Sequence, residues 1–112
     1  MWRVEYSKEA WRDLEKLDKH IIEIVLAGIE KVKQNPLPQS EGGYGKPLGH
    51  KGRQNLTGFF KIKYRNTGLR VVYNLYRAEK IMNIVVISKR DDDYCYQETY
   101  RRKIKYDDNS QV

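Results

Sequence analysis

The segment from Phe59 to Tyr73 constrains the fold most, because it has the pattern of a β-hairpin. In its first half, apolar and basic residues alternate with the period of two that is typical of a half-buried strand. The basic members are Lys61, Lys63 and Arg65. After the turn Asn66-Thr67-Gly68, Arg70 points away from the apolar set of the second strand. If Thr67-Gly68 is a two-residue loop, Arg65 lies opposite Arg70 and the basic residues share one face.

These four cations repel one another, so folding alone gives no reason to collect them on one face of a sheet. A solvated strand face would explain the row without any function, whereas a platform for a polyanion would give it one. Residues 1–49 carry as many acidic as basic residues, so the whole net charge of +7 arises in residues 50–112. This uneven distribution favours a phosphate-bearing or acidic partner on the strand side of the molecule.

The N-terminal part of the chain predicts a strand followed by two helices. Residues 2–6 alternate between apolar and polar, and Ser7 is a suitable N-cap for a helix that begins after it. Asp18 is the expected cap of a second helix, whose apolar residues from 21 to 32 recur every three to four positions. Gly28 weakens this helix by about 1 kcal/mol relative to Ala and permits close packing against it. Asn35-Pro36 ends it.

Residues 37–53 contain prolines, several glycines and no hydrophobic period, so a loop is expected there. Its basic members are candidates to contact phosphates, although solvated loop charge is the simpler interpretation. They are Lys46, His50, Lys51 and Arg53.

The rest of the chain predicts a turn, a central strand and a last helix. The turn spans residues 77–80, and residues 81–88 form a nearly continuous apolar run that is typical of a strand covered on both faces. Residues 94–105 are expected to form a short helix with Asp92 or Asp93 near its start, where negative charge is favourable. Residues 107–112 are expected to fray.

Together these elements predict an α+β fold in a single domain of residues 1–112. A strand and a two-helix hairpin would pack on an antiparallel sheet of about four strands, and the opposite, cationic face of the sheet would remain largely open.

The composition excludes several classes of protein. Cys95 is the only cysteine, so no internal disulfide can form and an intracellular location is expected. His20 and His50 lie in different contexts and no ligand spacing surrounds Cys95, so neither a metal nor a cofactor is expected. No apolar run approaches the length of a membrane span, and the N-terminus lacks a signal-peptide pattern. A soluble, cytoplasmic protein without membrane contact is predicted.

In its order of elements and in several short motifs, the chain resembles the RelE/ParE superfamily of bacterial type II toxin–antitoxin toxins, over roughly residues 2–104. No single motif is specific, but their order and spacing together are. The motifs are Lys46-Pro47-Leu48, Lys61-Ile62-Lys63-x-Arg65, Gly68-x-Arg70-x-Val72-Tyr73, and Val86-Ile87-Ser88 followed by Tyr96.

The superfamily contains two activities: RelE-like members cut mRNA in the ribosomal A site, and ParE-like members inhibit DNA gyrase without cutting RNA. RelE-like sites combine two lysines on one strand, an arginine on the next, an arginine at the end of the last long strand and a tyrosine six residues later. The resemblance therefore implies a metal-independent endoribonuclease whose catalytic residues are Lys61, Lys63, Arg70, Arg90 and Tyr96. Candidates for binding RNA phosphates around them are Arg65, Lys89 and Arg53.

Cleavage of this kind proceeds by attack of the ribose 2′-hydroxyl on the adjacent phosphate, which requires a general base, charge stabilisation and a general acid. Neighbouring cations lower the pKa of a lysine or a tyrosine, so Tyr96 or Lys61 is a candidate base. Arg70 suits the transition-state oxyanions, and Lys63 would hold the phosphate or share the role of base. By resemblance, Arg90 would join this clamp or protonate the leaving group.

Several of these residues have simpler interpretations. Tyr96 could be an amphipathic helix residue, and Tyr94 competes with it, although the spacing from Arg90 favours Tyr96. Arg90 could instead pair with the carboxylates of residues 91–93, which would also repel RNA.

The resemblance also implies partners: a cognate antitoxin, the 70S ribosome with its mRNA, and operator DNA only through the antitoxin complex. The antitoxin would be acidic, partly disordered and wrapped around the helices or the basic face. The alternatives are a ParE-like gyrase inhibitor without RNase activity and a degenerate member that binds only its antitoxin and operator DNA.

Overall fold

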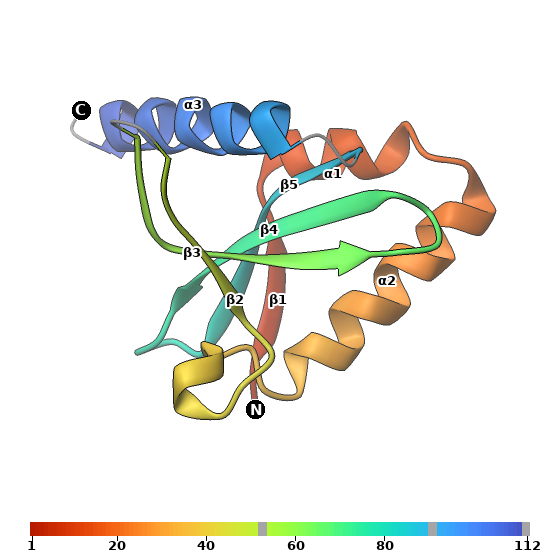
Figure 1. The fold of residues 1–112 in the computed structure, drawn as a ribbon, viewed down its shortest axis with the longest axis horizontal. Helices are drawn as coiled ribbons and strands as arrows, with labels where there is room; N and C mark the ends of the chain where they lie inside the picture. Colours follow the sequence, from red (N-terminus) through yellow and green to blue (C-terminus); the bar gives the residue numbers. More distant parts are fainter. Residues whose placement is uncertain (52–53, 90–91, 111–112) are drawn as a thin grey trace.

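The computed structural model describes residues 1–51, 54–89 and 92–110, which form one five-stranded sheet with helices on both faces (Figure 1). The strands lie in the order β1-β5-β4-β3-β2, with β1 parallel to β5 and every other neighbouring pair antiparallel. The strands are β1 (Arg3–Tyr6), β2 (Lys46–Lys51), β3 (Gln54–Tyr64), β4 (Leu69–Tyr76) and β5 (Ile81–Lys89). The helices are α1 (Lys8–Glu15), α2 (Lys19–Lys33), the 3₁₀ turn η1 (Gln39–Glu41) and α3 (Asp92–Ser110).

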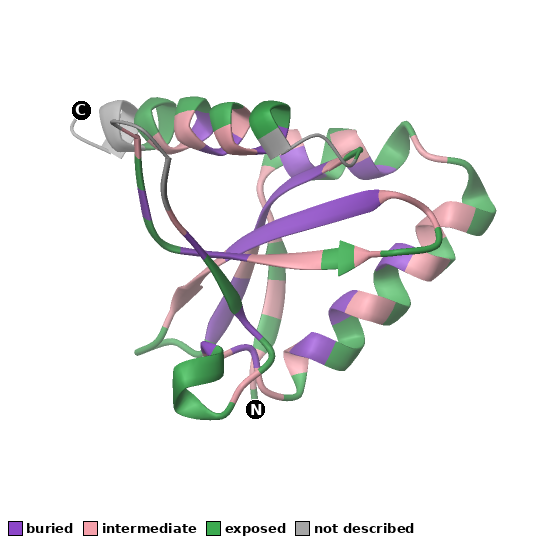
Figure 2. Ribbon diagram, in the orientation of Figure 1, coloured by how far each residue is buried: buried purple, intermediate pink, exposed green. Residues whose placement is uncertain are grey.

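The larger core lies between the sheet and the α1–α2 pair. Leu69, Val71 and Tyr73 of β4 are buried there against Val25 and Ile29 of α2, together with Met82 and Ile84 of β5. The alternation of residues in the sequence correctly predicted which side chains of β4 face this core. The run from 81 to 88 is also confirmed as a central strand, since β5 lies between β1 and β4 and is largely buried (Figure 2).

The two predicted helix starts are confirmed. Ser7 is the N-cap of α1, and its hydroxyl accepts a hydrogen bond of 3.1 Å from the amide of Ala10. Asp18 is the N-cap of α2, although its side chain makes no capping hydrogen bond. Gly28 does permit a close approach: a Cβ at this position would lie 2.6 Å from a ring carbon of Tyr64.

A smaller core lies on the opposite face of the sheet, beneath α3. Val72 and Val86 pack there with the buried Cys95 of α3, and Tyr96 and Tyr100 cover them in part. The prediction that this face remains largely open was therefore wrong. The helix predicted to end at residue 105 continues to Ser110, so it is long enough to span the sheet, and residues 107–110 of the tail predicted to fray lie within it.

The sheet differs from prediction in its strand number and direction. Strand β2 forms inside the predicted loop of residues 37–53, and β1 pairs in parallel with β5, so the sheet is mixed. The register of β2 against β3 shifts between Pro47 and Gly49. The residues of β2 therefore lack the alternation with a period of two that predicts a strand from sequence. Pairing with β3 stabilises this short strand instead.

The register of the central hairpin is also corrected. Lys63, and not Arg65, lies opposite Arg70, because the turn comprises the four residues 65–68. A two-residue hairpin loop at Thr67-Gly68 would require positive φ at or next to a β-branched residue, which is unfavourable. In the longer turn only Gly68 takes the left-handed conformation, at φ 68°.

Candidate functional site

Two cations of the predicted site face each other across the central strands. Lys63 of β3 lies directly opposite Arg70 of β4, and Ser88 of β5 lies on the other side of Arg70. Directly opposed residues of antiparallel strands point to the same face, which here is the face that carries α3. Lys63 is exposed, whereas Arg70 is only 6% exposed and its Nε and Nη1 atoms are shielded from solvent. Arg70 thus lies in the floor of the site and Lys63 at its surface.

Lys61 occupies the next position along β3 on the same face. Its direct neighbours are Val72 on β4 and Lys46 on β2. Lys46 is exposed and extends the cationic group toward the edge of the sheet. The sequence placed Lys46 in a loop, and the usable signal was Pro47, because the residue before a proline prefers extended backbone.

Tyr96 joins this group from the helix above it. The Nζ of Lys61 donates a hydrogen bond of 2.9 Å to the Tyr96 hydroxyl and lies 5.5 Å from the centre of its ring. Tyr94, the competing candidate, is 51% exposed and does not line the smaller core. The helix phase therefore agrees with the spacing argument that favoured Tyr96. We call Lys46, Lys61, Lys63, Arg70 and Tyr96 the cationic cluster.

Cys95 lies beside the cationic cluster without the properties of a nucleophile. Its thiol is buried, and burial raises its pKa, against the smaller lowering effects of a hydrogen bond with Ser88 and of the charges on Arg70 and Lys61. A thiol with a raised pKa is a poor nucleophile near neutral pH.

Of the remaining sequence candidates, Lys89 and Arg65 fall within the described residues. Lys89 is opposite Leu69, so its side chain lies on the α1–α2 face, where it lines a depression with Lys16 and Thr67. Arg65 is exposed in the hairpin turn. Arg53 and Arg90 lie outside the described residues. The structure thus brings Lys61, Lys63, Arg70 and Tyr96 together and separates Lys89 from them by the sheet.

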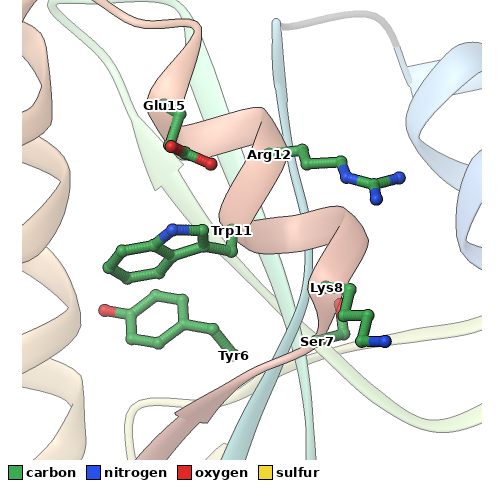
Figure 3. Close-up of a pocket in the computed structure, with 6 residues that line it drawn as sticks. All are labelled: Tyr6, Ser7, Lys8, Trp11, Arg12 and Glu15. Carbon is green, nitrogen blue, oxygen red and sulfur yellow. The ribbon is translucent and has the colours of Figure 1, made fainter.

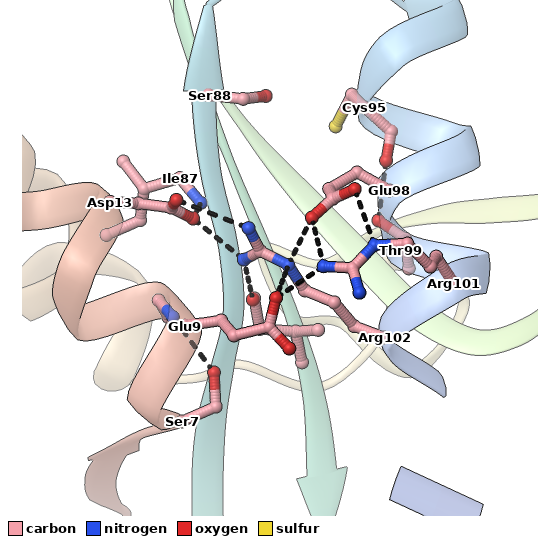
Figure 4. A network of polar contacts seen from close by, with 12 residues as sticks. Ser7, Glu9, Asp13, Ile87, Ser88, Cys95, Glu98, Thr99, Arg101 and Arg102 are labelled. Carbon is pink, nitrogen blue, oxygen red and sulfur yellow. Dashed lines mark hydrogen bonds and ion pairs between the residues drawn. The ribbon is translucent and has the colours of Figure 1, made fainter. Parts of the chain in front are cut away.

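Helix α3 is fixed by a network of charged residues that the sequence analysis did not identify (Figure 4). The guanidinium of Arg102 donates to both carboxylate oxygens of Asp13 on α1, at 2.7 and 3.2 Å, and to Glu98 at 2.8 Å. Arg101 pairs with Glu98 and Glu9. Burial disfavours the charge of Arg102, but Asp13 and Glu98 outweigh it and raise its pKa. The available signal was the spacing of Cys95, Thr99 and Arg102, which places an arginine on the buried stripe of a helix.

The same arginine network satisfies backbone groups at the edge of β5. Strand β1 pairs with β5 only as far as Ile84. Beyond that point, the amide of Ile87 donates to Asp13 at 3.0 Å, and the carbonyl of Val85 accepts from Arg102 at 2.7 Å. Side chains thus replace the missing strand and leave these groups paired.

A second depression, of about 300 Å³, lies between β1 and α1 (Figure 3). Its aromatic wall is Tyr6 against Trp11, with ring centres 5.6 Å apart and planes at 77°. Burial, with a further contribution from Glu30, raises the pKa of Tyr6, so its hydroxyl stays protonated. Trp11 is 50% exposed. The arrangement offers aromatic contact area, with the charged residues Lys8, Arg12 and Glu15 around it.

The described residues contain no set of three or more His, Cys, Asp or Glu side chains placed to hold a metal ion. Within the same residues, no helix has the length and apolar character needed to cross a membrane.

The fold is similar to that of solved toxins. The isolated RelE toxin of E. coli superimposes with a TM-score of 0.65 at 20% identity, covering 91% of this chain and 98% of that chain. The toxin–antitoxin complex RelBE2 from Mycobacterium tuberculosis gives 0.63 at 24% identity, covering 80% of this chain and 98% of the matched chain. A YoeB/ParE toxin from Agrobacterium tumefaciens gives 0.57 at 20% identity, covering 78% and 96%.

Sequence comparison identifies the family directly. Residues 4–94 match the sequence profile of the ParE toxin of type II toxin–antitoxin systems, parDE, and this match spans well over half of the chain. No curated protein gives a significant sequence match. The chain therefore belongs to the ParE toxin family, a branch of the RelE/ParE superfamily of type II toxin–antitoxin toxins.

Proposed function

We propose that this toxin is a ribosome-dependent endoribonuclease that cuts mRNA within A-site codons and so arrests growth. The observation that carries the proposal is the contact between Lys61 and Tyr96, 2.9 Å apart, beside the cross-strand pair of Lys63 and Arg70. A phosphodiester on the cationic cluster would have a hydroxyl–amine pair for proton transfer and two further cations for charge stabilisation.

In the proposed reaction, the ribose 2′-oxygen forms a bond to the adjacent phosphorus while the bond from phosphorus to the 5′-oxygen breaks. Tyr96 or Lys61 takes the 2′-hydroxyl proton. Lys63 and Arg70 stabilise the phosphorane charge, Arg70 from the floor of the site through the permanent charge of its guanidinium. The leaving 5′-oxygen receives a proton, for which Arg90 is a candidate. The products are a 2′,3′-cyclic phosphate and a 5′-hydroxyl, and no metal ion takes part.

The proposed partners follow from the same assignment. RelE of E. coli and RelBE2 of M. tuberculosis were solved in toxin–antitoxin complexes, which supports a cognate antitoxin for this chain. We propose that the toxin acts in the cytoplasm on the 70S ribosome and its mRNA, and reaches operator DNA only through the antitoxin complex. Lys46, which extends the cationic cluster to the sheet edge, would contact an RNA backbone phosphate.

Inhibition of DNA gyrase is the second candidate, because the matched profile is that of the parDE toxin. A gyrase inhibitor of this size would need a contact surface and no proton-transfer pair. The half-exposed Trp11, with the depression beside it, is such a surface on the opposite side of the sheet from the cationic cluster.

Induction in growing cells followed by mapping of mRNA 5′ ends distinguishes the two candidates. Ribonuclease activity predicts new 5′ ends inside coding regions, in phase with codons, that are lost with Lys61→Met and kept with Lys89→Met. Lys89 is the matched control because it lies on the other face of the sheet. Intact transcripts together with trapped DNA breaks would reject the ribonuclease and support the gyrase inhibitor.

A further inference from the structure

Helix α3 presents three adjacent stripes to the rest of the molecule. The central stripe contacts the sheet and contains only one apolar side chain in its described part; its members are Cys95, Thr99 and Arg102. The stripe toward β3 carries Tyr96, Tyr100 and Lys103, and the stripe toward α1 carries Glu98, Arg101 and Lys105. Since this central stripe has little apolar area, polar contacts contribute to the position of the helix.

Arg102 is the most buried charged residue in the described part of α3. Its side chain is 9% exposed and that of Asp13 is 16% exposed, so their two hydrogen bonds are largely shielded from water. Arg102 also donates to the carbonyl of Val85, and Asp13 accepts from the amide of Ile87. The pair therefore ties α3 to α1 and to a fixed point on β5.

Tyr96 lies on the same helix as Arg102, six residues earlier. A rise of 1.5 Å per residue separates them by about 9 Å, with no break in the helix between them. A rotation or shift of α3 at Arg102 therefore reaches Tyr96 almost undiminished. Its hydrogen bond to Lys61 tolerates displacements of only a few tenths of an ångström.

We propose that Asp13, acting through Arg102, is a positioning residue that holds the Tyr96 hydroxyl against Lys61. This inference rests on the proposed ribonuclease function for its catalytic consequence, but its structural part can be measured separately. The hydrogen bonds of Asp13 and Arg102 join α3 to α1 and to the backbone of β5, so their effect on cleavage would pass through the orientation of α3.

The structural arm compares tyrosine ring resonances in protein labelled at its tyrosines, with the Tyr96 signal assigned from the Tyr96→Phe spectrum. Asp13→Asn keeps the shape of the side chain and removes its charge. The Tyr96 resonance is expected to move toward that of the exposed Tyr94, while the signal of the buried Tyr73 stays in place and reports an intact core. Glu41→Gln, which breaks the exposed pair with Arg77, is the matched control and should move neither signal.

The kinetic arm measures cleavage of ribosome-bound mRNA. Asp13→Asn is expected to lower kcat by up to about 100-fold, the effect of a displacement near 1 Å, with little change in KM. In the Tyr96→Phe background the same substitution should cause no further loss, whereas a purely structural role would reduce both backgrounds alike.

Arg102→Lys keeps the charge but loses the two-pronged contact, and it replaces Asp13→Asn if that variant fails to fold. An unmoved Tyr96 resonance in a folded variant of either kind would overturn the positioning role. Absence of cleavage by the unmodified toxin would instead reject the proposed function. The Tyr96 resonance would still show whether Asp13 positions Tyr96.

Discussion

The side-chain amine of Lys61 and the hydroxyl of Tyr96 lie 2.9 Å apart and join β3 to α3. Thirty-five positions separate them in the sequence, so only the packing of α3 on the sheet brings them together. The cross-strand pair of Lys63 and Arg70 lies on the same face one step along β3. A hydroxyl and an amine in contact, next to two further cations, are an arrangement suited to the proposed phosphodiester chemistry.

Lys46 is expected to contribute to RNA binding because it lies opposite Lys61 and is exposed. Lys46→Gln should weaken binding of a single-stranded RNA oligonucleotide and reduce the slope of log K against log salt concentration by about 0.7, the value for one phosphate contact. Lys19→Gln, an exposed lysine on α2, is the control and should leave the slope unchanged. Equal slopes for the unmodified protein and both variants would show that Lys46 does not contact an RNA phosphate.

The packing of the Tyr64 ring against α2 is expected to require a glycine at position 28. The Tyr64 hydroxyl donates a hydrogen bond of 2.6 Å to the carbonyl of Val25, which holds the ring against α2. Alanine at position 28 would gain about 1 kcal/mol of helix propensity but would place Cβ 2.6 Å from the ring. Gly28→Ala should therefore lower the free energy of unfolding by about 1–3 kcal/mol.

Denaturant titration of the double variant tests this explanation for Gly28. In a Tyr64→Leu background the ring is absent, so Gly28→Ala should become neutral or stabilising. A destabilisation of equal size in both backgrounds would mean that Tyr64 is not the obstacle.

The stability of the α3 anchor is expected to depend on pH through Glu98. The hydrogen bond from Arg101, opposed by burial and supported by Arg102, lowers the pKa of this carboxyl from 4.5 to about 2. A lowered folded-state pKa stabilises the protein above pH 4.5, and that stabilisation is lost as the pH falls toward 2. Thermal unfolding should show Glu98→Gln less stable than the unmodified protein at pH 7 and nearly equal at pH 2.

The exposed Glu79, in the turn before β5, provides the control for the pH experiment. Glu79→Gln should have little effect at either pH. A difference between the unmodified protein and Glu98→Gln that persists unchanged at pH 2 would argue against an ionic role for Glu98.

Local patterns were sufficient for much of the fold. The apolar spacing of α2, the alternation of β3 and β4, and the continuous apolar run of β5 all identified elements that the structure contains. The predicted register of the hairpin differed from the observed one by two residues, yet the prediction that Lys61, Lys63 and Arg70 share one face was correct. A shift of two positions preserves the face of every side chain, and only a shift of one would have inverted it.

The features that local patterns missed depend on distant parts of the chain. Strand β2 exists because β3 pairs with it, and its own residues show no strand period. The contact of Arg102 with Asp13 joins residues 89 positions apart and buries charges that usually remain at the surface. The prediction of an open second face failed for the same reason, since α3 is polar in composition and is held partly by the ion pair of Arg102 with Asp13 of α1.

The most direct test of the account is in vitro cleavage of mRNA on purified ribosomes by the toxin, Tyr96→Phe and Tyr94→Phe. Both substitutions remove one hydroxyl from α3, but only that of Tyr96 contacts Lys61. The proposed acid–base role of Tyr96 predicts that Tyr96→Phe cuts about 100- to 10,000-fold more slowly, the usual contribution of general acid–base catalysis, while Tyr94→Phe cuts at the normal rate. Equal cutting rates for the two folded variants would contradict it.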